Sequence, residues 1–263
     1  MKEILIPALA MGAVGLVLGA VLAIASKVFS VKKDERALLI EEVLPGANCG
    51  SCGFAGCSAY AAAVSQGNAK VNCCSPGGQK TADEIAGIMG VASTAVEEKC
   101  AVILCSGTNE TAFDKYEYIG EKTCAAAARM QGGGQKACEY GCLGFGTCVA
   151  KCRNNAISIQ NGIAVVDESK CGGCGECAAV CPKKIIKIVP VTNKYVVKCK
   201  SCDKGALMKE KCSVGCIGCK ICEKNCPEEA IKVIDNCAVI DESKCVGCGI
   251  CAEKCPKKII AER

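Results

Sequence analysis

The sequence predicts an α+β protein with a single N-terminal transmembrane helix, a small helical four-cysteine domain and two tandem copies of a helix–strand unit. The chain of 263 residues contains 28 Cys but no His and no Trp. The stretch KCGGCGECAAVCPKKII from Lys170 recurs as KCVGCGICAEKCPKKII from Lys244, and residues 4–26 carry no charge. We expect an anchor at 1–30, the four-cysteine domain at 31–95, a linker with extra cysteines at 96–136, and units at 137–190 and 191–263.

The cysteine pattern favours metal ligation over a disulfide framework, because the cysteines come in tight C-x-x-C runs. Without His, the chain can form no Cys/His zinc site, His-ligated haem, Rieske centre or serine-type triad. Sites made of thiolates alone remain, holding either iron–sulfur clusters or zinc.

The formal charge of +5 does not indicate nucleic-acid binding once the thiols are counted as ligands. An oxidised four-iron cluster with four thiolates carries about −2, so five clusters would bring the balance to about −5. We expect no nucleic acid among the partners.

The uncharged segment 4–26 is long enough to cross the bilayer core of about 30 Å. It is longer than the apolar region of a signal peptide, which is the alternative interpretation. Basic residues are more frequent after the segment than before it, so positive-inside places the rest of the chain in the cytoplasm. We therefore expect a single-pass protein of the cell membrane with its cysteines on the cytoplasmic side.

The first cysteine motif after the anchor has a spacing of its own. Cys49, Cys52 and Cys57 follow the pattern C-x2-C-x4-C, and Cys73 or Cys74 could complete the site. An alanine-rich helix is expected over residues 58–65. Zinc could also use this spacing, so the motif alone indicates a metal and not its identity.

The second half of the chain is an internal duplication. A shift of 74 residues without a gap superimposes its cysteine motifs and the segment AVVDESKC, from Ala164, on AVIDESKC, from Ala238. Between the two motifs of each unit, alternating apolar residues predict a β-hairpin, with turns at Asn161-Gly162 and near Asp235-Asn236.

The pattern C-x2-C-x2-C-x3-C-P occurs three times and is typical of four-iron clusters in bacterial two-cluster ferredoxins. In such proteins the fourth cysteine binds the other cluster, so each unit should hold two clusters with crossed ligands. The expected sets are Cys152, Cys171, Cys174 and Cys177 (cluster 3); Cys216, Cys219, Cys222 and Cys255 (cluster 4); and Cys226, Cys245, Cys248 and Cys251 (cluster 5).

One site of the first unit departs from this rule, because Phe145 stands where the second unit has Cys219. Cys138 is the nearby candidate, which gives Cys138, Cys142, Cys148 and Cys181 as cluster 2. Eight cysteines then have no place: Cys73, Cys100, Cys105, Cys124, Cys199, Cys202, Cys212 and Cys237. A sixth cluster using Cys105, Cys124, Cys199 and Cys212 and a set of free buried thiols are both open interpretations.

The motif that ends in CCSPGG after an apolar segment resembles the iron–sulfur domain of the B component of the Rnf electron-transport complexes. The resemblance extends over the whole chain, and the duplicated part looks like the longer version of some anaerobic bacteria. In that family the fourth cysteine precedes a Pro-Gly-Gly turn, which implies Cys74, with Cys49, Cys52 and Cys57, as cluster 1.

The resemblance implies a subunit of an ion-translocating ferredoxin:NAD⁺ oxidoreductase that pumps Na⁺ or H⁺. Within that complex this chain would carry electrons, and it would not catalyse the reaction by itself. The resemblance also implies three kinds of partner: soluble ferredoxin, flavin- and NAD-binding membrane subunits, and lipid around residues 4–26. The cysteine sets above give about five [4Fe-4S] clusters, or six if the remaining cysteines bind another. The paired lysines Lys183-Lys184 and Lys257-Lys258 could guide an acidic ferredoxin or simply be solvated. The alternatives are an anchored polyferredoxin of another reductase or hydrogenase, and a zinc-stapled scaffold.

Overall fold

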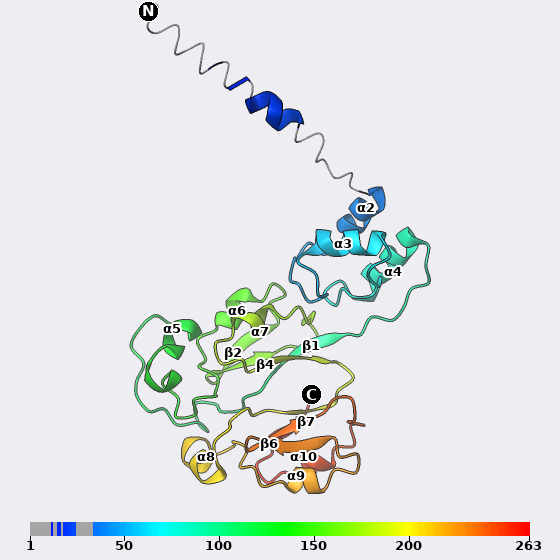
Figure 1. Ribbon diagram of the computed structural model, residues 1–263. Coiled ribbons are helices and arrows are strands. Elements are labelled where there is room, and N and C mark those ends of the chain that lie inside the picture. The colour runs from blue at the N-terminus through cyan, green and yellow to red at the C-terminus, as the bar shows by residue number, and fades with distance from the viewer. Residues whose placement is uncertain (1–11, 13–14, 17, 25–33) are drawn as a thin grey trace, which may run out of the picture.

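The computed structural model describes residues 12, 15–16, 18–24 and 34–263 (Figure 1). Most of the predicted transmembrane segment lies outside these residues. Its described part is helical, and the side chains of Leu16 and Leu22 are 78% and 69% exposed. Within the described ranges, no helix combines the length and apolar character needed to span a membrane.

The first folded part is a small helical domain made of α2 (Glu35–Val43), α3 (Cys57–Ser65) and α4 (Gly78–Met89). The helix expected over residues 58–65 is confirmed as α3, which begins at Cys57 itself. The fully buried side chains of Ile40, Tyr60 and Ile85, one from each helix, form its core.

The two units predicted from the duplication follow in order along the molecule, as Figure 1 shows. Each has a short helix, a hairpin, a second short helix and a final strand. The first unit contains α6 (Thr147–Lys151), β2 (Ile157–Gln160), β3 (Ile163–Val166), α7 (Glu176–Val180) and β4 (Ile186–Pro190). The second contains α9 (Ile221–Lys224), β6 (Ile231–Ile234), β7 (Cys237–Ile240), α10 (Ile250–Lys254) and β8 (Ile260–Glu262).

Both predicted hairpins are confirmed. Strand β2 pairs with β3, and β6 pairs with β7, in antiparallel register. The turn residues Asn161 and Gly162 have φ of 45° and 78°, and Asp235 and Asn236 have φ of 48° and 64°. Positive φ at both central residues is the requirement of the tight hairpin turns that the sequence indicated.

The last strand of each unit pairs with a strand that precedes the unit. Strand β4 is antiparallel to β1 (Lys99–Ile103), and β8 is antiparallel to β5 (Tyr195–Val197). The segment 96–136, predicted as a linker, therefore supplies a strand to the first unit. It also carries α5 (Cys124–Ala128) and the short helix η1 (Gln131–Gly133), while α8 (Gly205–Lys211) lies between the two units in sequence.

Cysteine takes the place that large apolar residues have in most cores. In the first unit, Ile157, Ile185 and Ile186 pack with buried cysteines, and in the second unit Ile231 and Ile259 do the same. Because thiol side chains are small, they leave space between their sulfur atoms that a larger group could fill to native packing density.

One left-handed backbone position, which is glycine in the first unit and lysine in the second, gives a test of the fold. The residue before α6 is Gly146, with φ of 73°, and its equivalent before α9 is Lys220, with φ of 60°. An L-residue there costs about 1–2 kcal/mol, partly offset by the greater freedom of unfolded glycine. We expect Lys220→Gly to raise the unfolding temperature and Gly146→Lys to lower it, measured by anaerobic calorimetry. Shifts of the same sign in both variants would contradict this.

Candidate metal centres

The second unit brings its cysteines together in the two crossed groups predicted for clusters 4 and 5. One small apolar pocket is lined by Cys216, Cys219, Cys222 and Cys255, and another by Cys226, Cys245, Cys248 and Cys251. The crossing arises because the cysteine within each short helix, Cys222 or Cys251, lines one pocket, while the cysteine just after the helix, Cys226 or Cys255, lines the other. The two pockets thus lie in one shared core.

The first unit repeats this arrangement for the cysteines expected at cluster 3. Cys152, Cys171 and Cys177 belong to one core, and burial, with the nearby thiols of Cys174 and Cys171 next, raises the pKa of Cys177 to about 12. The amide of Ala156 donates to Cys152 Sγ at 3.2 Å, as that of Ala230 does to Cys226 Sγ at 3.3 Å. The equivalent bonds hold the crossed ligand of each unit in the same way.

The group expected at cluster 2 differs from the prediction in one member. A pocket joins Cys142, Cys148 and Cys181 to Cys124, while Cys138 lines a separate pocket. The amide of Cys124 donates to Thr147 Oγ1 at 2.9 Å, which holds the start of α5 beside the start of α6. Burial, followed by the thiols of Cys142, Cys124 and Cys181, raises the pKa of Cys148 to about 11. Cys124 therefore takes the place that Cys138 has in the sequence-based set.

The cysteines expected at cluster 1 also lie together. Burial raises the pKa of Cys74, and the nearby thiols of Cys57, Cys49 and Cys52 add to the rise. The Tyr60 hydroxyl donates to the carbonyl of Lys70 at 2.7 Å and accepts from the amide of Cys73 at 3.2 Å. This contact fixes the Cys73–Cys74 segment, with the Cys74 side chain near the other three thiols.

The donor set fits iron–sulfur clusters. None of the 28 cysteines forms a disulfide. Packing several thiols into one buried pocket raises their pKa values, so ionising all of them there requires a positive core between the sulfurs. Among the described residues, no three Cys, Asp or Glu side chains converge closely enough to hold one metal ion. A four-iron cluster would be bound by the four thiolates of each group and would supply one-electron redox chemistry there.

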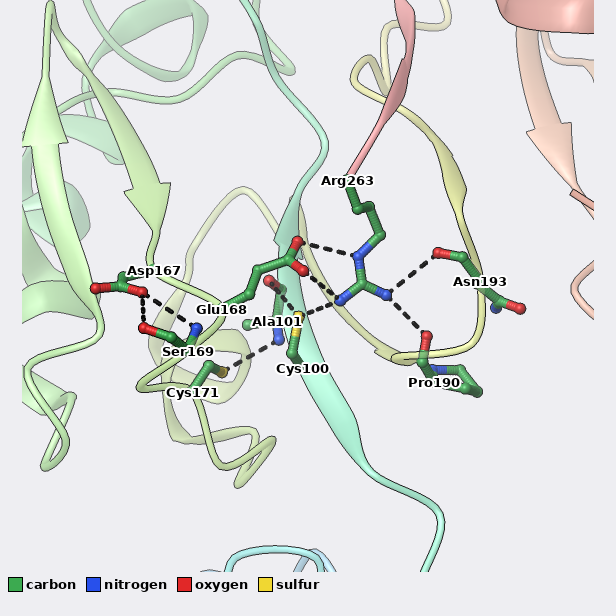
Figure 2. A network of polar contacts seen from close by, with 9 residues as sticks. All are labelled: Cys100, Ala101, Asp167, Glu168, Ser169, Cys171, Pro190, Asn193 and Arg263. Carbon is green, nitrogen blue, oxygen red and sulfur yellow. Dashed lines mark hydrogen bonds and ion pairs between the residues drawn. The ribbon is translucent and has the colours of Figure 1, made fainter. Parts of the chain in front are cut away.

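Two cysteines outside these groups act on ligand sulfurs through hydrogen bonds. Hydrogen bonding with the Cys100 side chain is the main cause that lowers the pKa of Cys171 to about 6. The Cys100 thiol also donates to the carbonyl of Ala101 at 3.5 Å, while the amide of Ala101 donates to Cys171 Sγ at 3.4 Å. Figure 2 shows Cys100 in turn beside the guanidinium of Arg263, which also bonds both carboxylate oxygens of Glu168, at 3.0 and 3.1 Å. The Arg263 guanidinium is thus separated from the expected site of cluster 3 only by the side chain of Cys100.

Cys237, in β7 of the second unit, has a similar role, and its thiol donates to the carbonyl of Cys199 at 3.4 Å. Hydrogen bonding with the Cys237 side chain is the main cause that lowers the pKa of Cys199 to about 7 and that of Cys216 to about 6, and its single S–H can serve one acceptor at a time. Donors to a ligand sulfur stabilise the more negative, reduced cluster. We expect Cys237→Ala to lower the reduction potential of cluster 4, and Cys237→Ser to restore most of it, by EPR-monitored redox titration. Equal potentials for both variants and the natural chain would contradict this role.

The motifs, the crossed cysteine groups and the paired hairpins define the chain as an iron–sulfur protein with two tandem ferredoxin-type units. Comparison with family models agrees. Residues 44–76 match the family described as "Putative Fe-S cluster", and residues 164–187 and 238–261 match "4Fe-4S binding domain".

Individual proteins identify the family. The chain is 44% identical over 93% of its length to the B component of the Na(+)-translocating ferredoxin:NAD(+) oxidoreductase complex of Acetobacterium woodii, covering 73% of that protein. It is 42% identical to the B component of the proton-translocating ferredoxin:NAD(+) oxidoreductase complex of Clostridium ljungdahlii, with 92% and 86% coverage. Identity to the B component of the ion-translocating oxidoreductase complex of Methanosarcina acetivorans is also 42%, with 93% coverage of both. The chain belongs to this family, the B components of the Rnf complexes.

Proposed function

We propose that this chain is the iron–sulfur relay of an ion-translocating ferredoxin:NAD⁺ oxidoreductase, taking electrons from reduced soluble ferredoxin and passing them toward flavin- and NAD-binding subunits. The observation that carries the proposal is the series of four-cysteine groups in neighbouring cores. The ligand sets that we propose are those named above, with Cys74 for cluster 1 and Cys124 for cluster 2.

The helical domain belongs to the same relay as the ferredoxin units. Burial raises the pKa of Cys174, and among the charges that add to the rise is the thiol of Cys49, from the site of cluster 1. A β carbon on Gly172 would lie 3.6 Å from Cα of Pro76. These contacts support a place for cluster 1 next to cluster 3 in the proposed relay.

The lysines expected to guide ferredoxin have two different roles. Lys183 donates to the carbonyl of Glu139 at 2.5 Å, and Lys257 donates to that of Ser213 at 2.7 Å, so these two side chains bind their own chain. Lys184 and Lys258 are exposed, and the Lys258 ammonium also donates to the carbonyl of Glu253, at 3.0 Å; we propose these two lysines for steering. We expect Lys184→Glu with Lys258→Glu to slow reduction by ferredoxin about tenfold at low salt, with little difference at high salt. The matched control is Lys209→Glu on α8, and equal rates for both proteins would remove the steering role.

We also propose that residues 4–26 anchor the chain in the cell membrane as a single span, with the clusters on the cytoplasmic side. The support is the uncharged sequence, the exposed apolar side chains of its described part and the basic residues that follow it. Extraction by detergent but not by carbonate would support the anchor, and release of the full chain by high salt would contradict it.

Metal analysis of the anaerobically purified chain tests the relay. Five clusters require about twenty iron and twenty sulfide per chain. Zinc in place of iron, from cells grown with iron, would contradict the relay and leave a stapled scaffold. An anchored polyferredoxin of another reductase is separated by the subunits that copurify, since the proposal requires flavin- and NAD-binding ones.

A further inference from the structure

Four cysteines outside the ferredoxin motifs line one pocket between the two units. Cys105, Cys138, Cys199 and Cys212 surround it, and they come from segments far apart in the sequence. None of the three regions that match family models includes any of them. Three of the four were among the cysteines that the sequence left without a place.

The four cysteines form two pairs, one from each unit. The shift of 74 residues places Cys138 on Cys212. Cys105 and Cys199 each lie just after the first strand of their unit, β1 or β5. The amide of Cys142 donates to Cys105 Sγ at 3.4 Å, and the amide of its equivalent, Cys216, donates to Cys199 Sγ at 3.4 Å. Each unit therefore contributes an equivalent pair of cysteines to the pocket.

Equivalent contacts hold the second pair in place. The Lys183 and Lys257 ammonium groups bind the carbonyls of Glu139 and Ser213, the residues that directly follow Cys138 and Cys212. Lys183 and Lys257 are themselves related by the same shift. The two sides of the pocket are thus built by one repeated arrangement.

The pocket matches the other cysteine sites in size. Its space of about 370 Å³ compares with about 350, 340 and 360 Å³ at the sites of clusters 2, 4 and 5. A β carbon on Gly107 would lie 3.5 Å from Cys212 Sγ and 3.7 Å from Cys105 Sγ. Both sulfurs therefore border the same small space, which glycine leaves open.

A buried cation lies at the edge of this pocket. Lys136 lines it and is only 3% exposed. Its ammonium donates to the carbonyls of Gly107, at 2.6 Å, and Gly162, at 3.4 Å, and no ion pair among the described residues includes it. A buried charge is costly unless an opposite charge is near, and a four-thiolate cluster of about −2 supplies one.

We propose that Cys105, Cys138, Cys199 and Cys212 bind a sixth [4Fe-4S] cluster that carries electrons between the two ferredoxin units. This extends the proposed relay and rests on it. The cluster gains one electron as a neighbouring cluster in one unit is oxidised, and it loses that electron as a cluster in the other unit is reduced.

The neighbours of the site define its place in the relay. Cys142 is a member of the group for cluster 2, and Cys216 is a member of the group for cluster 4. Their amides contact Cys105 and Cys199, so one hydrogen bond separates the sixth site from each neighbour. The resulting order is clusters 1, 3, 2, 6, 4 and 5.

Native mass spectrometry of the anaerobically purified full chain counts the clusters without any substitution, and we expect six. We further expect the Cys138→Ala, Cys212→Ala double variant to lose four iron and four sulfide per chain and to keep about twenty of each. The matched control is Cys202→Ala, since Cys202 is exposed and belongs to no group. Its metal content should equal that of the natural chain.

The results that would overturn the sixth site differ from those that would overturn the relay. Five clusters in the intact chain, or five clusters with one zinc, would reject the sixth cluster and leave the relay standing. If the double variant loses all its clusters, the number of clusters in the intact chain decides by itself whether the sixth cluster exists. Fewer than five clusters in the intact chain would reject the relay itself.

Discussion

Replacing Cys124 by alanine is expected to remove one complete cluster, four iron and four sulfide, from the first unit. Cys124 is held beside Cys148 by the Thr147 hydroxyl, and the pocket that they share has no other cysteine to replace it among its lining residues. Anaerobic metal analysis measures the loss. The double variant with Cys138→Ala should lose eight iron, because the two cysteines belong to different sites.

The comparison of single and double variants separates the two ligand sets for cluster 2. If Cys138 completed the cluster, as its position near Cys142 in the sequence suggested, Cys124→Ala would keep its full metal content. Full metal content in Cys124→Ala would therefore contradict the assignment. The Cys202→Ala control shows that loss of an exposed thiol alone does not reduce the yield of clusters.

Substitution of Arg263 by alanine is expected to lower the free energy of unfolding by about 3 kcal/mol. The Arg263 side chain is only 5% exposed, and its guanidinium joins Glu168 of the first unit to the carbonyls of Pro190, at 2.8 Å, and Asn193, at 3.4 Å (Figure 2). Without it, the half-exposed Glu168 carboxylate and two carbonyls lose their donor. Anaerobic calorimetry of the holo-protein would record the change as a lower unfolding temperature.

Arg263→Lys is the matched variant, since it keeps the charge. An ammonium cannot reproduce the paired contacts of the planar guanidinium, so most of the loss should remain. The two Arg263 variants also test whether Arg263 affects the reduction potential of cluster 3, because its guanidinium contacts Cys100, beside Cys171. Arg263→Ala should lower the potential of cluster 3 more than Arg263→Lys does. Unchanged stability and potential in both variants would contradict the account of this network.

The features that the sequence predicted are those set by local pattern. The Asn161-Gly162 turn and the alternating residues around it were sufficient for a hairpin, because both requirements lie within a few residues. The alanine-rich stretch after Cys57 was sufficient for a helix. The crossed cysteine groups were predictable because the motif C-x2-C-x2-C-x3-C-P carries its own geometry.

The place of Cys124 was not predictable from pattern. It depends on a hydrogen bond to Thr147 that only the folded chain forms, and no motif surrounds Cys124 in the sequence. The sixth group left a weak signal, since Cys138 and Cys212 coincide under the shift of 74 residues. The pairing of Cys105 with Cys199 had none, because the first unit has a longer segment between its first strand and its first motif.

We expect electrons from soluble ferredoxin to enter this chain and to spread over its clusters. The most direct test mixes the anaerobic full chain with an excess of reduced ferredoxin and follows its clusters by freeze-quench EPR. The account predicts reduced-cluster signals within the time of a few turnovers, with magnetic coupling between neighbouring clusters. Clusters that dithionite reduces but ferredoxin leaves oxidised would contradict the relay.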